Sequence, residues 1–442
     1  MPAFDTQELK QALEDIQVAV QAQPDHPELI NLRGTVYLQL QEYELALNDF
    51  ECATRLAPEY AIAFFNWATT LHGLGHSESA LVYFDHALRI KPGFMQAWSN
   101  KGNALHALSR LDEALFCYDQ ALSCEPNSAD VRWNKSHTLL LQGRFEQGWP
   151  LYEYRLHTQG FVPRSFNSAR WLGDKPLKGA SIFVHVEQGL GDTLQFLRYL
   201  EPLVETGARI TLEVPASLLP LAKNIQGVAQ VIALGEPPAE TDFHCPLISL
   251  PLALKRYCPF VPQHLDLSLQ ASATTLAQWQ SRLGARTKPR VGLVVQGNVH
   301  NKKNHLRSIA LTQWVAHLPS DLDFVLLHDQ LPSEQLALIS KQTNWRFMGA
   351  DIKSFEDTAA LCQLMDVVIS VDTSVAHLSA SLRRPTWLVL PFAPDWRWQL
   401  GRTDSPWYPS MRLFRQSQPG EWADVLQSLS HALEDFLQAL RI

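Results

Sequence analysis

Four prolines spaced 34 residues apart divide the first part of the 442-residue chain into equal blocks; they are Pro24, Pro58, Pro92 and Pro126. A small residue, an aromatic residue and a second small residue recur in register with these prolines. The triplets are Ala46, Phe50 and Ala53; Ala80, Phe84 and Ala87; Ala114, Tyr118 and Ala121. Small residues let neighbouring helices approach closely, and the aromatic ring fills the space between helix pairs. The period therefore predicts a stack of helical hairpins.

The 34-residue unit resembles the tetratricopeptide repeat. A half-repeat begins upstream at Ala12, and the pattern decays at Gly148, Tyr152 and Arg155. The arginine stands where a small residue belongs, which is typical of a terminal repeat whose outer face meets something other than another repeat. We therefore expect an α-solenoid over residues 1–160.

The acidic residues are concentrated in this array. Residues 1–160 carry 11 Lys and Arg against 20 Asp and Glu, whereas the whole chain has a formal charge of −8. Phosphate binding needs a basic face, so the repeats are not expected to bind nucleic acid. The chain starts Met-Pro-Ala-Phe-Asp without a signal-like segment, and we see no apolar run long enough to span a bilayer. These features predict a cytoplasmic protein that does not span a membrane.

After residue 160 the period gives way to short apolar runs that alternate with helical patterns. Strands are expected near 181–186, 209–214 and 228–234, and again from 290 onward, which indicates an α/β fold with two Rossmann-like halves facing a cleft. The expected segments are a linker over 161–178, a first half over 179–272, a connection over 273–288, a second half over 289–420 and an amphipathic C-terminal helix over 421–442.

The loop that follows the first strand contains Gly189, Gly191 and Asp192. The third glycine of a dinucleotide-binding loop is replaced by Leu194, so a nicotinamide enzyme is not expected. Asp192 and Gln195 have the spacing of a capping box, and Asp192 is also a candidate general base. A helix N-terminus should lower the pKa of this aspartate, which is unfavourable for a base. Both interpretations stay open.

A second loop, around Asp372, Thr373, Ser374 and His377, joins an apolar strand to a helix. Free backbone N–H groups and the helix dipole would make this junction a phosphate site. The alternatives are ordinary helix capping by Thr373 or Ser374 and a packing role for His377.

A third loop follows the first strand of the second half and runs through Asn298, Lys302, Lys303 and Arg307. Its cations could neutralise a diphosphate without a metal ion, and Arg307 is the best candidate; the two lysines could equally form a solvated turn. Asp321-Leu-Asp323 has the form of a metal-binding motif but no third ligand, so we interpret it as a surface turn. We expect no metal and no cofactor.

The segments G-L-G-D-T-L-Q-F, V-D-T-S-V-A-H-L, P-D-W-R-W, S-P-W-Y-P and R-L-F-R-Q, placed after a repeat array, resemble bacterial tetratricopeptide-repeat glycosyltransferases related to the heptosyltransferases. The resemblance covers almost the whole chain. It implies a GT-B fold and an inverting, metal-independent transfer of a sugar from a nucleotide-sugar donor.

The resemblance also implies roles for individual residues. The base of the relatives maps onto Asp192, and their nucleotide contacts map onto Asp372 and His377. The implied phosphate contacts are Thr373 and Ser374, and the implied cation is Arg307, near a lysine pair that departs from the family pattern. The glycines of the first loop, Gly189 and Gly191, and Asn298 of the third loop are further candidate donor contacts.

Asn66, Asn100 and Asn134 occupy one position in three successive repeats, with Leu32 at that position in the first. A column of amides can hydrogen-bond the backbone of an extended peptide, and this one resembles the asparagine ladder of the protein O-linked N-acetylglucosamine transferase. The alternative is that these asparagines pack the helix pairs.

Our leading hypothesis is a glycosyltransferase that modifies a Ser or Thr hydroxyl of a protein bound by the repeats, with the layout of the flagellin glycosyltransferases. Two alternatives remain. The acceptor could be a lipopolysaccharide or another glycan, or the chain could be a non-catalytic adaptor with a vestigial GT-B domain.

Overall fold

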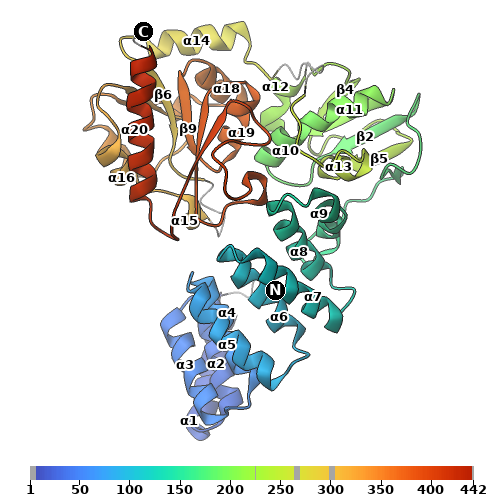
Figure 1. Ribbon diagram of the computed structural model, residues 1–442, viewed down its shortest axis with the longest axis vertical. Helices are drawn as coiled ribbons and strands as arrows, with labels where there is room; N and C mark the ends of the chain where they lie inside the picture. Colours follow the sequence, from blue (N-terminus) through green and yellow to red (C-terminus); the bar gives the residue numbers. More distant parts are fainter. Residues whose placement is uncertain (1–5, 224, 263–268, 298–303, 441–442) are drawn as a thin grey trace. The chain divides into compact units, whose positions relative to one another are not determined.

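The computed structural model describes residues 6–223, 225–262, 269–297 and 304–440, which form two compact units, Met1–Val162 and Pro163–Ile442 (Figure 1). The division lies within a few residues of the boundary expected from the sequence. Asn298, Lys302 and Lys303, named above as candidates, lie outside the described residues.

The first unit is built from helical hairpins (Figure 1). Its helices are α1 Thr6–Ala22, α2 Pro27–Gln39, α3 Tyr43–Leu56, α4 Ala61–Gly73, α5 Ser77–Ile90, α6 Met95–Ala107, α7 Leu111–Cys124, α8 Ala129–Leu141 and α9 Phe145–Tyr152, followed by the 3₁₀ turn η1 Glu153–His157. The predicted α-solenoid is confirmed.

The periodic residues form the core of this unit because small and aromatic positions are matched across each hairpin. Phe50 and Phe84 have no exposed surface, and Tyr118 is 1% exposed. A Cβ atom added at Gly34 would lie 2.8 Å from the Phe50 ring, and one at Gly102 would lie 2.6 Å from the Tyr118 ring. The first helix of a repeat therefore needs a small residue where the aromatic ring of the second helix packs.

The last repeat departs from the pattern as the sequence indicated. Helix α9 contains Pro150 and ends in η1, where Arg155 is 3% exposed. Its guanidinium donates to Glu153 Oε1 at 2.7 Å. The arginine that replaces the small residue is thus buried and paired inside the unit.

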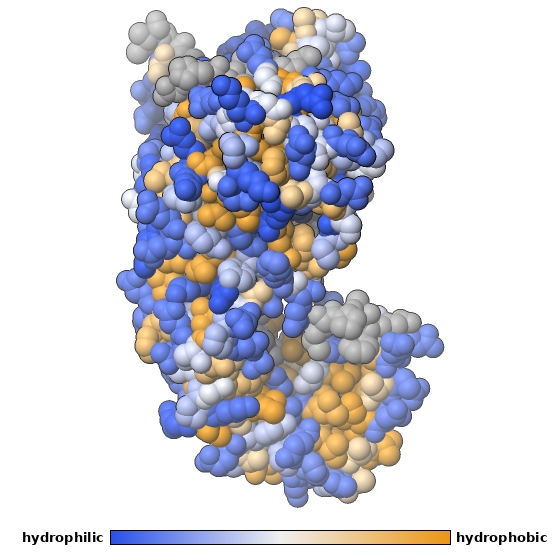
Figure 2. Space-filling view, turned by 90° about the vertical axis from the view of Figure 1, so that its right-hand side faces the viewer, coloured by the Kyte–Doolittle hydropathy of each residue, from blue (hydrophilic) through white to orange (hydrophobic). Residues whose placement is uncertain are grey.

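Several large apolar side chains remain exposed on the array. They include Val18, Leu32, Val82 and Phe116, with exposed fractions from 47% to 67%. The face seen in Figure 2 shows apolar patches between hydrophilic areas. Exposed apolar surface of this kind is available for binding a partner.

The second unit begins with a parallel sheet in the order β1-β5-β2-β3-β4. Its strands are β1 Ala169–Arg170, β2 Ser181–His185, β3 Arg209–Val214, β4 Gln230–Ala233 and β5 Phe243–Pro246. Its helical segments are α10 Leu190–Phe196, η2 Leu197–Tyr199, α11 Leu200–Glu205, η3 Ala216–Leu218, α12 Leu219–Ala222, η4 Leu247–Ser249 and α13 Leu250–Ala253.

The expected linker is part of this unit from residue 163 onward. It supplies the edge strand β1, which pairs with β5. Arg164 makes two hydrogen bonds to Glu213, a fully buried carboxylate on β3, at 2.7 and 2.8 Å. A buried charge is tolerated only when it is paired, so this contact fixes the start of the unit to its first sheet.

The second sheet is also parallel, in the order β11-β10-β9-β6-β7-β8. Its strands are β6 Arg290–Val294, β7 Asp323–Leu326, β8 Trp345–Phe347, β9 Val367–Val371, β10 Thr386–Leu390 and β11 Met411–Arg415. The remaining helices are α14 Ala273–Leu283, α15 Asn304–Arg307, α16 Leu311–His317, α17 Ser333–Ile339, η5 Gly349–Asp351, α18 Phe355–Gln363, α19 Ser374–Ser381, η6 Trp396–Trp398 and α20 Ala423–Leu440.

Helices cover both faces of the second sheet because alternate strand residues point to opposite sides. Val291 and Leu293 pack with the buried stripe of α20, whereas Val294 packs with Trp279 of α14. Both the expected connection and the expected C-terminal helix therefore pack on the second half. Asp323, expected in a surface turn, is instead 7% exposed at the start of β7.

The strand orders locate the places where each sheet can bind a ligand. In each sheet, successive strands are added first on one side of the starting central strand and then on its other side. This change falls between β2 and β5 in the first sheet and between β6 and β9 in the second. Ligands of doubly wound folds bind outside the carboxyl ends of the strands at such a switch point. Helix α10 follows β2 and helix α19 follows β9, so both begin at a switch point.

Candidate functional site

The first loop ends in a capped helix. Gly189 is the N-cap of α10, and its backbone N–H donates to Asp192 Oδ2 at 3.1 Å. The predicted capping box, with Asp192 as the N-cap and Gln195 three residues later, is therefore wrong: Asp192 caps α10 from its third position, with Gly189 as the N-cap. The carboxylate keeps a second oxygen for another contact, so capping leaves a further role open.

The second loop leaves the start of its helix uncapped by a side chain. Thr373 is the N-cap of α19, but its hydroxyl lies 3.0 Å from the hydroxyl of Ser370 and makes no capping bond. Ser374 is the first residue of the helix. The structure thus does not support the simple capping alternative for Thr373. The first-turn N–H groups of α19 are suited to an anion.

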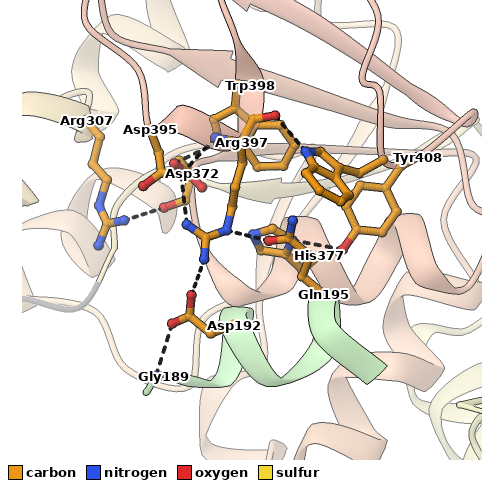
Figure 3. Close-up of polar contacts among 11 residues, drawn as sticks. Gly189, Asp192, Gln195, Arg307, Asp372, His377, Asp395, Arg397, Trp398 and Tyr408 are labelled. Carbon is orange, nitrogen blue, oxygen red and sulfur yellow. Dashed lines mark hydrogen bonds and ion pairs between the residues drawn. The ribbon is translucent and has the colours of Figure 1, made fainter. Parts of the chain in front are cut away.

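The two helices meet at Gly191. A Cβ atom added there would lie 3.1 Å from His377 Cδ2 and 3.6 Å from Ser374 Cα. A side chain at Gly191 would press on the His377 ring, so the glycine favours the close approach of α10 in the first half to α19 in the second. The Gly189–Asp192 loop and the Asp372–His377 loop therefore lie side by side (Figure 3).

His377 is a buried, hydrogen-bonded imidazole. It is 4% exposed, its Nδ1 lies 2.9 Å from the Tyr408 hydroxyl, and its ring stacks on Trp398. Burial, reinforced by the charges of Arg397 and Arg198, lowers the pKa of His377 to about 3. A neutral histidine in this position satisfies the packing interpretation, and it also shapes the surface that faces Gly191.

Asp372 and Arg307 lie side by side at the carboxyl end of the second sheet. The Arg307 guanidinium donates to the Asp372 backbone carbonyl at 2.7 Å, and the Trp398 indole N–H donates to Asp372 Oδ2 at 2.9 Å. Gly297, after β6, lies so close to Arg307 that a Cβ atom would clash with its guanidinium. Arg307, predicted from the third loop, is therefore brought to the α19 junction.

Arg397 completes the site, and it is not among the predicted residues. Its guanidinium forms an ion pair with Asp192 and a hydrogen bond with Gln195 across the two halves, and it donates to Asp395 Oδ1 at 2.8 Å (Figure 3). A signal is present in the sequence, because Arg397 is the cation of P-D-W-R-W. A charge among tryptophans is expected to be buried and paired.

The acidic groups of the site have shifted pKa values. Burial raises the pKa of Asp192 above its ordinary value, while Arg397 and the Gly189 N–H oppose the shift. Burial, with a smaller contribution from Asp395, raises the pKa of Asp372 to about 6. The pKa decrease expected for Asp192 from the helix terminus is thus outweighed by desolvation, and a raised pKa favours a general base.

The asparagine column lies on the first helix of successive hairpins, where two of its members already bond within the array. Asn66 Nδ2 donates to Asn31 Oδ1 at 2.9 Å, and Asn100 Nδ2 donates to Thr69 Oγ1 at 3.2 Å. Asn31, next to Leu32, supplies the acceptor from the first repeat. All three predicted residues, including Asn134, are half-buried, so packing between repeats is part of their role.

Within the described residues we find no cluster of three or more His, Cys, Asp or Glu side chains that could hold a metal ion. Nor does any described helix combine the length and apolarity needed to cross a bilayer.

Comparison with known proteins identifies the repeats. Two models of the tetratricopeptide repeat match residues 31–94 and 96–128. The first unit is therefore an array of tetratricopeptide repeats.

A curated relative extends beyond the array. Protein FlbA of Caulobacter vibrioides is 27% identical over 321 residues, which cover 66% of this chain and 53% of FlbA. The chain thus spans about half the length of the curated relative it matches, and FlbA is a distant homologue.

Among solved structures, YrrB, described as a TPR protein with an unusual peptide-binding site, is 25% identical with a TM-score of 0.30, covering 35% of this chain and 79% of YrrB. A thermophilic TPR protein of Thermus thermophilus is 22% identical with a TM-score of 0.31, covering 34% of this chain and 83% of that protein.

Proposed function

We propose that the protein is an inverting, metal-independent glycosyltransferase of the GT-B type, which moves a sugar from a nucleotide-sugar donor to a Ser or Thr hydroxyl of a protein. One observation carries the proposal: Gly191, next to Asp192 in the chain, lies against the first turn of α19, whose N–H groups are suited to an anion. The proposed base would then face the proposed phosphate site, as a single-displacement transfer requires.

In the proposed reaction, Asp192 accepts the proton of the acceptor hydroxyl while the hydroxyl oxygen attacks the anomeric carbon. The bond from that carbon to the donor phosphate breaks on the opposite side, which inverts the configuration. The N–H groups of α19, with Thr373 and Ser374, and the Arg307 guanidinium would stabilise the negative charge of the departing diphosphate. Asp372, whose backbone holds Arg307, would contact the donor nucleotide.

The repeats would select the acceptor. Extended peptides bind to repeat arrays of this kind, and the Asn66, Asn100 and Asn134 column offers amide oxygens to a peptide backbone. Flagellin is a concrete candidate acceptor, proposed from the likeness in layout to the flagellin glycosyltransferases. The exposed apolar side chains of the array would add contact area.

The Asp192→Asn variant tests the chemistry. The full chain is incubated with a nucleotide sugar found by thermal-shift screening and with a candidate flagellin, whose intact mass is then measured. We expect wild type to add one sugar mass and Asp192→Asn to lose about 10² to 10⁴-fold in rate. Its melting temperature provides the control for folding.

Two outcomes would contradict the proposal. If a glycan gains the sugar while the candidate protein stays unmodified, the acceptor is a glycan and not a protein. If no nucleotide sugar stabilises the protein, the adaptor interpretation would replace it.

A further inference from the structure

The segment Asp395–Trp398 joins the two loops of the site through neighbouring residues. Arg397 reaches the first half, where it pairs with Asp192 and Gln195, whereas Trp398 stays in the second half and donates to Asp372. Adjacent residues in the chain thus hold both aspartates of the site (Figure 3).

The segment is itself held rigidly in place. Asp395 accepts from the Arg397 backbone N–H at 3.0 Å and from its guanidinium at 2.8 Å. The Arg397 carbonyl accepts from the Trp407 indole N–H at 2.8 Å. The guanidinium also lies 4.3 Å from the centre of the Trp396 ring, a cation–π distance. An arginine fixed at backbone and side chain can impose its position on the group it contacts.

A second buried arginine makes a contact from the first half to the second. Arg198 of the first half is 3% exposed and donates to the Trp407 carbonyl of the second half at 2.8 Å. It also lies 4.6 Å from the centre of the Tyr408 ring, whose hydroxyl bonds His377. Each half therefore buries an arginine against the other, next to the α10 and α19 junction.

We infer that Arg397 is a positioning residue that orients Asp192 and fixes it relative to the donor loop, so that base and donor site are assembled together. The inference rests on the proposed function for its catalytic consequence, but the contact itself is independent of it. The Nε–H of Arg397 donates to Gln195, Nη1 to Asp395 and Nη2 to Asp192, so each nitrogen of the guanidinium has a partner and the pair with Asp192 has a defined geometry.

The pKa of Asp192 gives the inference a second readout. The charged groups that act on Asp192 are Arg397, which lowers its pKa, and Asp395, which raises it; the neighbouring His377 is neutral. Removing the cation should raise the pKa of Asp192 further. The acidic limb of the pH profile of kcat/KM should then move to higher pH in Arg397→Gln.

A double-mutant cycle tests the contact without turnover. The melting temperature of the second unit is measured for wild type, Asp192→Asn, Arg397→Gln and the double variant. We expect each single variant to melt several degrees lower and the double variant to lose less than the sum of the two. Additive losses would overturn the inference even if transfer activity is found.

Kinetics test the consequence. We expect Arg397→Gln to lower kcat about 10²-fold with little change in the donor KM, and Arg397→Lys to recover part of the loss. Arg402→Gln, which removes an arginine paired with Asp404 in the same region, is the control and should leave kcat and the pH profile unchanged. An unchanged pH profile in Arg397→Gln would overturn the positioning role, whereas full activity in Asp192→Asn would instead overturn the proposed function.

Discussion

The two units differ in how far apart in the chain their defining contacts lie. In the array, Lys101 pairs with Asp85 16 residues away, and the same contact recurs one repeat later between Lys135 and Asp119. In the second unit, Arg397 pairs with Asp192 205 residues away. A local, repeated contact leaves a visible period in the sequence, whereas a single distant contact leaves none. The array is therefore easier to predict than the site.

The largest effect is expected from emptying the core of one repeat. Phe84 has no exposed surface, so Phe84→Ala should cost about 3 to 5 kcal/mol in the stability of the array. Calorimetry should show the transition of the first unit moving down while that of the second unit stays. Phe116→Ala, at a side chain 58% exposed, is the control and should change little. A joint shift of both transitions would show that the units do not unfold separately.

A smaller effect is expected from filling the space that the period reserves. Gly102→Ala places a Cβ atom 2.6 Å from the Tyr118 ring, so we expect a loss of about 1 to 3 kcal/mol despite the better helix propensity of alanine. Gly73 also lies in a first helix, but a Cβ atom there meets nothing within 4 Å. Gly73→Ala should be neutral or stabilising by up to about 1 kcal/mol. Equal effects at the two glycines would contradict the packing account.

The second unit should show a pH dependence that arises at Asp372. Its pKa is about 6 in the folded protein, above the unfolded value of about 4, so the unfolded chain releases the proton first. Stability should therefore fall as pH rises from about 4 to about 6. Asp372→Asn should remove this fall. At pH 7 it should raise the free energy of unfolding of the second unit by about 1 to 2 kcal/mol, which is measured as a higher melting temperature.

Asp242, whose pKa is shifted in the opposite direction, provides the control. The Ser181 N–H and hydroxyl lower the pKa of exposed Asp242, so its contribution to stability is present above the unfolded pKa and lost as pH falls. Asp242→Asn should destabilise at pH 7 and not at low pH. If both variants shift stability in the same direction, the desolvation account of Asp372 is wrong.

The smallest effect is expected from the repeated ion pair. Lys101 Nζ lies 2.5 Å from Asp85 Oδ1, and the aspartate is 52% exposed. Lys101→Met should cost less than about 1 kcal/mol, and added salt should reduce the difference from wild type. Lys135→Met should give the same loss, because the contact repeats. Clearly unequal losses would show that the repeats are not energetically equivalent.

Most elements of the second unit could be predicted where the apolar run was long enough. The strand Arg209–Val214 has the predicted bounds. Edge strands such as β1 and the short strand β5, which contains Pro246, have too few apolar residues to be recognised. They exist because neighbouring strands provide hydrogen-bond partners, which is a tertiary effect.

The two loops of the candidate site could be predicted from the sequence, but the arginine that joins them could not. Asp192 and the Asp372–His377 loop stand out because glycine, acid and hydroxyl residues follow predicted strands. Arg397 does not stand out in the sequence, because the role of a buried arginine is apparent only from the carboxylate it pairs with, and that carboxylate is distant in the chain. The pKa shift expected for Asp192 also has the wrong direction, since helix capping is local but desolvation depends on what packs over the loop.

The sequence by itself determined that the chain begins with an array of helical hairpins and continues with two α/β halves, because period and strand patterns are local properties. Only the tertiary structure decided that Gly191 lies against His377, that Arg397 meets Asp192, and that amides of the asparagine column bond to neighbouring repeats. The physical reason is that packing, burial and charge pairing depend on residues brought together from distant positions. Those contacts bring two ordinary strand-to-helix loops together into one candidate site.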